Sequence, residues 1–196
     1  MDAKSKHALY STLRENIIEH IFAGELLKLL WQRGIVDAEI LKSEFDAGGY
    51  DLVLSCRDVT RHIQLKIARE GGSRSDVSVN LNLAKKPSGC VVWIVVNDDL
   101  DFKNFLWFGS EEPHNPLPPI DHMKVAKHAK GTAEGIKNER PNHRLVKRSN
   151  FTSVATLEGV LFKLLGRDLM ASVTPRVYVS SAHSADFLYD EQGLPL

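Results

Sequence analysis

Residues 51–66 contain the side-chain types that could hold a divalent cation and a phosphate group together. Asp51 opens an apolar run, and Gln64 and Lys66 stand in a second run farther along the chain. Side chains at positions i and i+2 of a strand point to the same face, so His62, Gln64 and Lys66 would share one face. A hairpin that pairs the two runs would bring Asp51 beside them. Carboxylate and amide oxygens are ligands for hard cations, and a lysine can stabilise a phosphate.

A long helix is expected over residues 11–33, because apolar residues recur there at helical spacing and Gly34 supplies a stop signal. On a projection of about 100° per residue, Glu19 and Glu25 both lie on or beside the apolar stripe. A carboxylate at such a position needs a partner, since an unpaired charge is costly to bury.

The pattern resembles that of the PD-(D/E)xK nuclease superfamily, which includes many restriction enzymes and archaeal Holliday-junction resolvases. Asp51, Gln64 and Lys66 match its motif, a helix that contains glutamates precedes them, and the resemblance covers residues 15–110. The sequence departs from the usual pattern at Gln64, where Asp or Glu is the common residue. The resemblance implies a restriction endonuclease-like fold of the α/β (α+β) class, with a central mixed β-sheet flanked by helices.

The resemblance also implies a nuclease that hydrolyses DNA phosphodiester bonds with Mg²⁺ or Mn²⁺ as cofactor. Asp51 and Gln64 would hold the metal, and the backbone carbonyl of Leu65 would be a further ligand. Glu19 is the preferred helix carboxylate, because apolar residues follow it at the family's usual spacing. Glu25 is the alternative, and either would reach the metal directly or through water.

Lys66 would orient the attacking water and stabilise the phosphate, as the equivalent lysine does in the resembled family. His62 could bind the scissile phosphate or act as a general base. Each residue also has a structural alternative. Lys66 could be an edge lysine that points to solvent, Gln64 a polar residue on a solvated face, and His62 a structural histidine.

Residues 124–148 form a positively charged segment in a chain whose formal net charge is zero. Such a segment can follow a phosphate backbone, although a solvated loop is the alternative. The candidate DNA contacts are Lys124, Lys127, Lys130, Lys137, Arg140, Arg144, Lys147 and Arg148.

The remaining elements follow from alternation and turn signals. Strands are expected at 38–41, 50–55, 60–68 and 105–108, and 90–96 is apolar on both faces, which indicates a fully buried central strand. Residues 77–86 fit either a strand or a helix. Residues 110–122 are expected to form a surface loop and 154–165 a short amphipathic helix.

Size and composition indicate one domain over residues 1–166 and a tail, 167–196, that is either disordered or paired with a partner. The apolar fraction of 43% suffices for a core. No apolar run is long enough to span a membrane, the N-terminus lacks a signal-peptide pattern, and the two cysteines lack metal-ligand spacing. A cytoplasmic protein is therefore expected.

Two other functions remain open on the sequence. The Gln64 departure would suit a nuclease-fold module that binds DNA without cleaving it. The basic segment would also suit a subunit that docks an acidic partner protein. A homodimer is compatible with the nuclease hypothesis, because a duplex has two strands to cut.

Overall fold

The computed structural model describes residues 9–45, 47–128 and 137–166. The elements in these ranges are α2 (Ser11–Gln32), β1 (Ala38–Lys42), β2 (Leu52–Cys56), β3 (Val59–Arg69), β4 (Asp76–Asn80), α3 (Leu81–Ala84), β5 (Gly89–Val96), β6 (Phe102–Gly109), β7 (Val125–Lys127), β8 (Glu139–Lys147), the 3₁₀ turn η1 (Arg148–Asn150), β9 (Thr152–Val154) and α4 (Leu157–Leu165).

A six-stranded sheet in the order β1-β2-β3-β5-β6-β9 forms the centre of the fold. Strands β3 and β5 pair in parallel, and the other neighbouring strands are antiparallel. A second, three-stranded sheet has the order β4-β8-β7. The expected α/β class, with a mixed sheet flanked by helices, is therefore confirmed.

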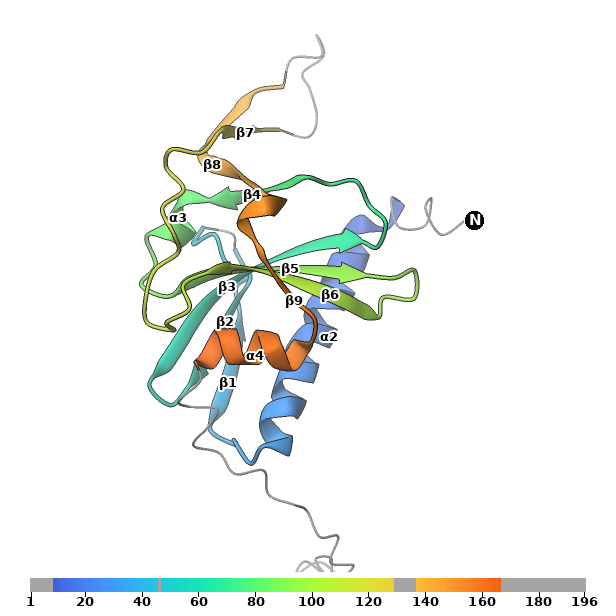
Figure 1. Ribbon diagram of the computed structural model, residues 1–196, viewed down its shortest axis with the longest axis vertical. Helices are drawn as coiled ribbons and strands as arrows, with labels where there is room; N and C mark the ends of the chain where they lie inside the picture. The colour runs from blue at the N-terminus through green and yellow to red at the C-terminus, as the bar shows by residue number, and fades with distance from the viewer. Residues whose placement is uncertain (1–8, 46, 129–136, 167–196) are drawn as a thin grey trace, which may run out of the picture.

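Helices α2 and α4 lie on one side of the central sheet and the small sheet lies on the other (Figure 1). Helix α2 buries Ile18, Phe22, Leu26 and Leu30, which recur every four residues and so form one stripe against the central sheet. Helix α4 packs into the same core, whereas β4, α3 and β8 cover the other face. Both faces of the central strands are thus shielded from water.

Strand β5 is buried along its whole length, as its unbroken apolar sequence predicts. It lies between β3 and β6, and its alternate side chains enter the two cores. Val92 and Ile94 contribute to the core beneath the helices, and Val91 and Trp93 to the core beneath the small sheet. A strand covered on both faces tolerates apolar residues at every position.

Two segments differ from the expected elements. The ambiguous residues 77–86 contain both structures, because β4 ends at Asn80 and the short helix α3 follows it directly. The C-terminal helix begins at Leu157 rather than at Val154, since Val154 pairs with Phe105 in β9 and Thr156 caps the helix. The tail 167–196 lies outside the described residues.

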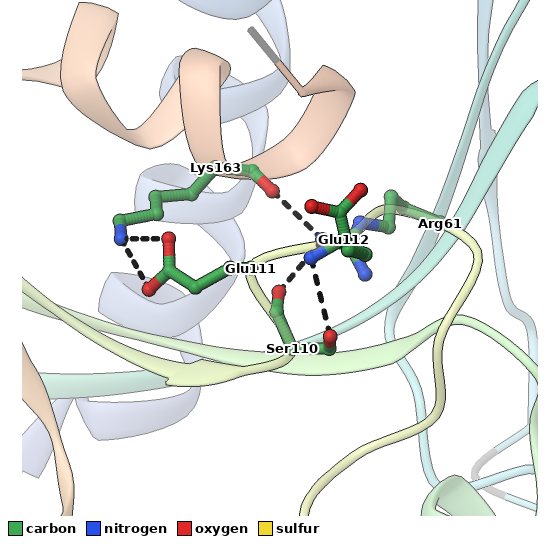
Figure 2. Close-up of polar contacts among 5 residues, drawn as sticks. All are labelled: Arg61, Ser110, Glu111, Glu112 and Lys163. Carbon is green, nitrogen blue, oxygen red and sulfur yellow. Dashed lines mark hydrogen bonds and ion pairs between the residues drawn. The ribbon is translucent and has the colours of Figure 1, made fainter.

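Arg61 is a fully buried cation that joins three parts of the fold (Figure 2). Its Nε donates to the carbonyl of Leu164 at 2.9 Å, and its Nη2 donates to the carbonyls of Lys163 and Ser110 at 2.7 Å and 3.2 Å. The guanidinium also stacks over Trp107, 5.3 Å from the ring centre. Because the last carbonyls of a helix lack intrahelical partners, Arg61 satisfies the C-terminus of α4 and holds it against β3.

In the described ranges, no helix is long and apolar enough to cross a membrane.

Candidate active site

A glycine turn and the short helix α3 set the position of the chain just before β2. Gly49 has a φ of 74°, and a Cβ atom there would lie 2.7 Å from Cβ of Asn80, so only glycine fits this contact. Asn80 caps α3 by accepting a hydrogen bond from the amide of Asn82 at 2.9 Å. The side chain of Asn82 in turn donates to the carbonyl of Ala47 at 3.0 Å. The turn and α3 are therefore held together beside Asp51.

Asp51 contacts β3 through both its backbone and its side chain. Its amide donates to the carbonyl of Ile63 at 2.9 Å, and its Oδ2 accepts a hydrogen bond from the amide of Leu65 at 2.6 Å. The carboxylate thus takes the place of a strand neighbour at the edge of β3. It lies where Gln64 and Lys66 flank Leu65 along the strand, which is the juxtaposition expected from a hairpin.

Alternation along β3 separates its side chains between the two cores. Ile63 and Leu65 pack in the core beneath α2. His62, Gln64 and Lys66 alternate with them and therefore share the opposite face, on the side of the small sheet. The expected common face of these three side chains is present in the structure.

Gln64 is buried, with only 3% of its surface exposed. Its Oε1 is buried and has no hydrogen-bond partner among the residues that the structure describes. A buried acceptor without a donor costs about 1–3 kcal/mol. The alternative of a solvated polar side chain is therefore wrong for Gln64, and the unsatisfied oxygen is available to a cation or another donor.

The backbone of Leu65 adds a further oxygen at this edge. The N–H and C=O groups of one strand residue point to the same side of the strand. Because the Leu65 amide points to Asp51, its carbonyl points to the same edge, where the carbonyl of Ile67 also lies within 3.5 Å of Arg74 Nη1. The Asp51 carboxylate therefore meets β3 beside Leu65, whose carbonyl lies at this edge and whose neighbour Gln64 carries the amide oxygen.

Glu19 lies at the same end of the sheet as Asp51, on the helix side. Its side chain is 16% exposed, and Oε1 is 2.7 Å from Nζ of Lys42. Lys42 pairs with Leu52, the residue that follows Asp51, in the β1–β2 ladder. The partner that a nearly buried carboxylate needs is thus Lys42, which places Glu19 close to the candidate site.

Glu25 lies elsewhere on α2. Its carboxylate is 3.2 Å from Lys28 on the same helix, and the side chain is 43% exposed. It lines a cavity of ≈440 Å³ together with residues 99–102 of the β5–β6 turn. Six residues correspond to about 9 Å along a helix, which explains why Glu19 and Glu25 meet different parts of the sheet.

His62 contacts two neighbours on its face of the sheet. Its Nδ1 is 3.1 Å from Oγ of Ser88, and its ring lies edge-on to Tyr50 with centroids 4.9 Å apart. Burial lowers the pKa of His62, and the nearby positive charge of Lys86 lowers this pKa further. The neutral imidazole is therefore favoured near neutral pH, the form that can accept a proton.

The low pKa of His62 should make folding less favourable in acid. The unfolded chain binds a proton at this histidine near pH 6.5, whereas the folded protein resists protonation until a lower pH. The free energy of unfolding should therefore decrease as the pH falls below 6.5, and His62→Gln should reduce this decrease. Denaturant titrations of the natural chain and His62→Gln at neutral and acidic pH measure this decrease. An identical pH dependence of the free energy of unfolding in the two proteins would contradict the prediction.

Within the basic segment 124–148, residues 125–127 and 139–147 form strands β7 and β8 and Arg148 starts η1, so the loop alternative does not hold for these residues. Four of its lysines are exposed: Lys124, Lys127, Lys137 and Lys147. Arg144 instead donates to the carbonyls of Asp121 and Pro141, at 3.1 Å and 2.7 Å. Arg140 Nη2 lies 2.7 Å from Nε2 of His143. Lys130 lies outside the described residues.

Sequence reasoning missed Asn80, Tyr50 and Ser88, which position the site. The Asn-Leu-Asn sequence at 80–82 carries an N-cap signal that could have located the start of α3. Tyr50 and Ser88 lie far apart in the chain, and only the fold brings them to His62. No spacing rule would have found that contact.

The donor set suits a hard cation such as Mg²⁺, which takes one or two protein carboxylates and leaves its other positions to water or phosphate. Asp51, Gln64 and the Leu65 carbonyl supply oxygen donors of this kind. In the described part of the chain, no three His, Cys, Asp or Glu side chains cluster to hold a metal. Comparison with protein-family models and with curated proteins finds no match for this chain.

Proposed function

We propose that this protein is a metal-dependent nuclease that hydrolyses DNA phosphodiester bonds. The observation that carries the proposal is the 2.6 Å hydrogen bond from the Leu65 amide to Asp51. This contact holds a carboxylate at the edge of the strand that presents Gln64 and Lys66. The resemblance to PD-(D/E)xK nucleases rests on the same residues.

Asp51, the orphaned oxygen of Gln64 and the carbonyl of Leu65 would hold Mg²⁺ or Mn²⁺. When bound, such an ion supplies Lewis-acid polarisation of the phosphate and a water of lowered pKa. Glu19 would join the site through a water molecule, because its carboxylate already pairs with Lys42 at 2.7 Å. We do not assign Glu25 to the site, since it faces the β5–β6 turn.

Lys66 would stabilise the charge that develops on the phosphate during hydrolysis. It stands next to the Leu65–Asp51 contact, and its strand position faces Trp93 of β5. A preorganised cation in a site partly shielded from water acts more strongly than the same charge in solvent. His62, kept neutral by its surroundings, would accept a proton from the attacking water or bind the phosphate.

The exposed lysines in and beside β7 and β8 would contact the DNA backbone beside this site. Lys127 and Lys147 belong to the small sheet, which lies on the side of the central sheet opposite α2 and α4 (Figure 1). Binding should therefore weaken with salt, with a slope of about 0.9 log units per phosphate contact.

The testing experiment offers the full chain linear, plasmid, single-stranded and branched DNA in Mg²⁺, in Mn²⁺ and in EDTA. Asp51→Asn is the matched variant, because it keeps the size of the side chain and removes the charge. Cleavage that requires the metal and is lost in Asp51→Asn supports the proposal. Failure to cleave any of these substrates, or equal cleavage by the variant, contradicts it.

The neutral amide of Gln64 favours a second candidate function, that of a nuclease-fold module that binds DNA without cutting it. An amide oxygen binds a hard cation less strongly than a carboxylate does. This module would bind DNA equally well in EDTA and in Mn²⁺, and Gln64→Glu would be expected to tighten Mn²⁺ binding. Metal-dependent cleavage by the natural chain would rule the module out.

A further inference from the structure

A cavity of ≈530 Å³ lies between the connection from β3 to β4 and the end of β8. Its lining includes three cations and three hydroxyl groups, from Arg74, Lys147, Arg148, Ser73, Ser75 and Ser149. Groups of this kind are the usual protein donors to phosphate oxygens.

The two segments that line the cavity are tied together by backbone contacts. Asp76 and Lys147 are paired across the β4–β8 ladder. The amide of Arg148 donates to the carbonyl of Ser75 at 2.8 Å. Because the backbone of the two walls is linked in this way, the segments that carry the cations are already side by side before any ligand arrives, which lowers the entropic cost of binding.

Among the residues that the structure describes, the cations of this cavity have no ion-pair partner. Within residues 9–45, 47–128 and 137–166, the side chains of Arg74, Lys147 and Arg148 form no ion pair. The single carboxylate in the lining, Asp76, lies 3.4 Å from Oγ of Ser75. Three cations against one carboxylate leave a local excess of positive charge, which an anion would neutralise.

The cavity adjoins the candidate active site along β3. Arg74 Nη1 is 3.5 Å from the carbonyl of Ile67, and Asp51 binds the amide of Leu65 on the same edge of the strand. Two residues of a strand span roughly 7 Å. On the other side of the cavity, Arg148 stacks 5.6 Å from the ring centre of Trp93, whose register partner on β3 is Lys66.

We propose that this cavity binds a backbone phosphate of DNA that neighbours the phosphate to be cleaved. The inference rests on the proposed function and adds Arg74 and the three serines to the residues that contact the substrate. A second anchored phosphate would fix the position of the strand over Asp51 and Lys66. Lys147 is the last residue of β8, so the strand would pass from the small sheet into the cavity.

The test compares the natural chain with a double variant, Arg74→Ser with Lys147→Ser. The control is Lys103→Ser with Arg57→Ser, which removes the same charge from exposed positions outside the cavity. Fluorescence anisotropy follows binding to a short labelled duplex in EDTA, over a series of KCl concentrations. The cavity variant should bind more weakly, with a salt slope lower by about one, and the control should bind as the natural chain does. Denaturant midpoints verify that each protein is folded.

Equal affinity and equal salt slope in the cavity and control variants would overturn the inference, as would a natural chain that does not bind the duplex. The cleavage assay separates this result from the proposed function. DNA binding that is weakened in the cavity variant, without cleavage in Mg²⁺ or Mn²⁺, would support the phosphate site and contradict the proposed nuclease activity. Metal-dependent cleavage, together with DNA binding that is the same in the cavity variant and the control, would support the nuclease and rule out the phosphate site.

Discussion

Lys66→Ala should lower the rate of metal-dependent DNA cleavage by about 100- to 1,000-fold. The change removes the cation that stands beside the Leu65–Asp51 contact and would stabilise charge on the phosphate. Because this interaction is made in the transition state rather than with bound substrate, the loss should appear in kcat with little change in KM. Single-turnover cleavage measures it on the most reactive DNA substrate.

Lys103→Ala is the matched control for this prediction. Lys103 is an exposed strand lysine on β6, so its loss should leave cleavage unchanged. DNA binding in EDTA by Lys66→Ala should stay within a few-fold of the natural chain, which separates a catalytic loss from a binding loss. Cleavage by Lys66→Ala at the rate of the control would show that Lys66 has no role in catalysis.

Arg61→Met should reduce the free energy of unfolding by about 3 kcal/mol. Methionine fills much of the space of arginine but cannot donate to the carbonyls of Leu164, Ser110 and Lys163; Figure 2 shows the contacts to the last two. A buried charge is itself costly, and burial accordingly lowers the pKa of Arg61. Its removal offsets part of the loss, but the carbonyls belong to the main chain and remain buried without a donor.

Arg57→Met provides the comparison, because Arg57 is an exposed arginine that pairs with Asp37 at 3.4 Å on the surface. Exposed ion pairs contribute about 0–1 kcal/mol, so this variant should be nearly as stable as the natural chain. Chemical denaturation of the two variants gives the difference between their free energies of unfolding. If Arg61→Met unfolds at the same denaturant concentration as Arg57→Met, the proposed role of Arg61 in holding α4 is wrong.

Some features of the fold could be predicted because they depend on local patterning. The unbroken apolar run of β5 indicated a strand buried on both faces, and period-two alternation placed His62, Gln64 and Lys66 on a common face. The spacing of Ile18, Phe22, Leu26 and Leu30 likewise predicted α2. Each of these signals is contained within one element.

The helix glutamates show what such local signals cannot predict. A projection placed Glu19 and Glu25 beside the same apolar stripe, yet Glu19 pairs with Lys42 near Asp51 and Glu25 pairs with Lys28 on its own helix. The difference is set by which part of the sheet lies under each turn of α2. Helical periodicity contains no information about that neighbour.

The sequence by itself determined the chemical types available to the candidate site and the strand faces on which they stand. The tertiary structure decided which of them meet: the Asp51 carboxylate at the amide of Leu65, Ser88 at His62, and Arg74 beside Arg148 across the β4–β8 end. The physical reason is the distance along the sequence over which each kind of signal acts. Alternation and helical periodicity act over a few residues, whereas these contacts join segments whose approach depends on strand order and on the packing of both cores.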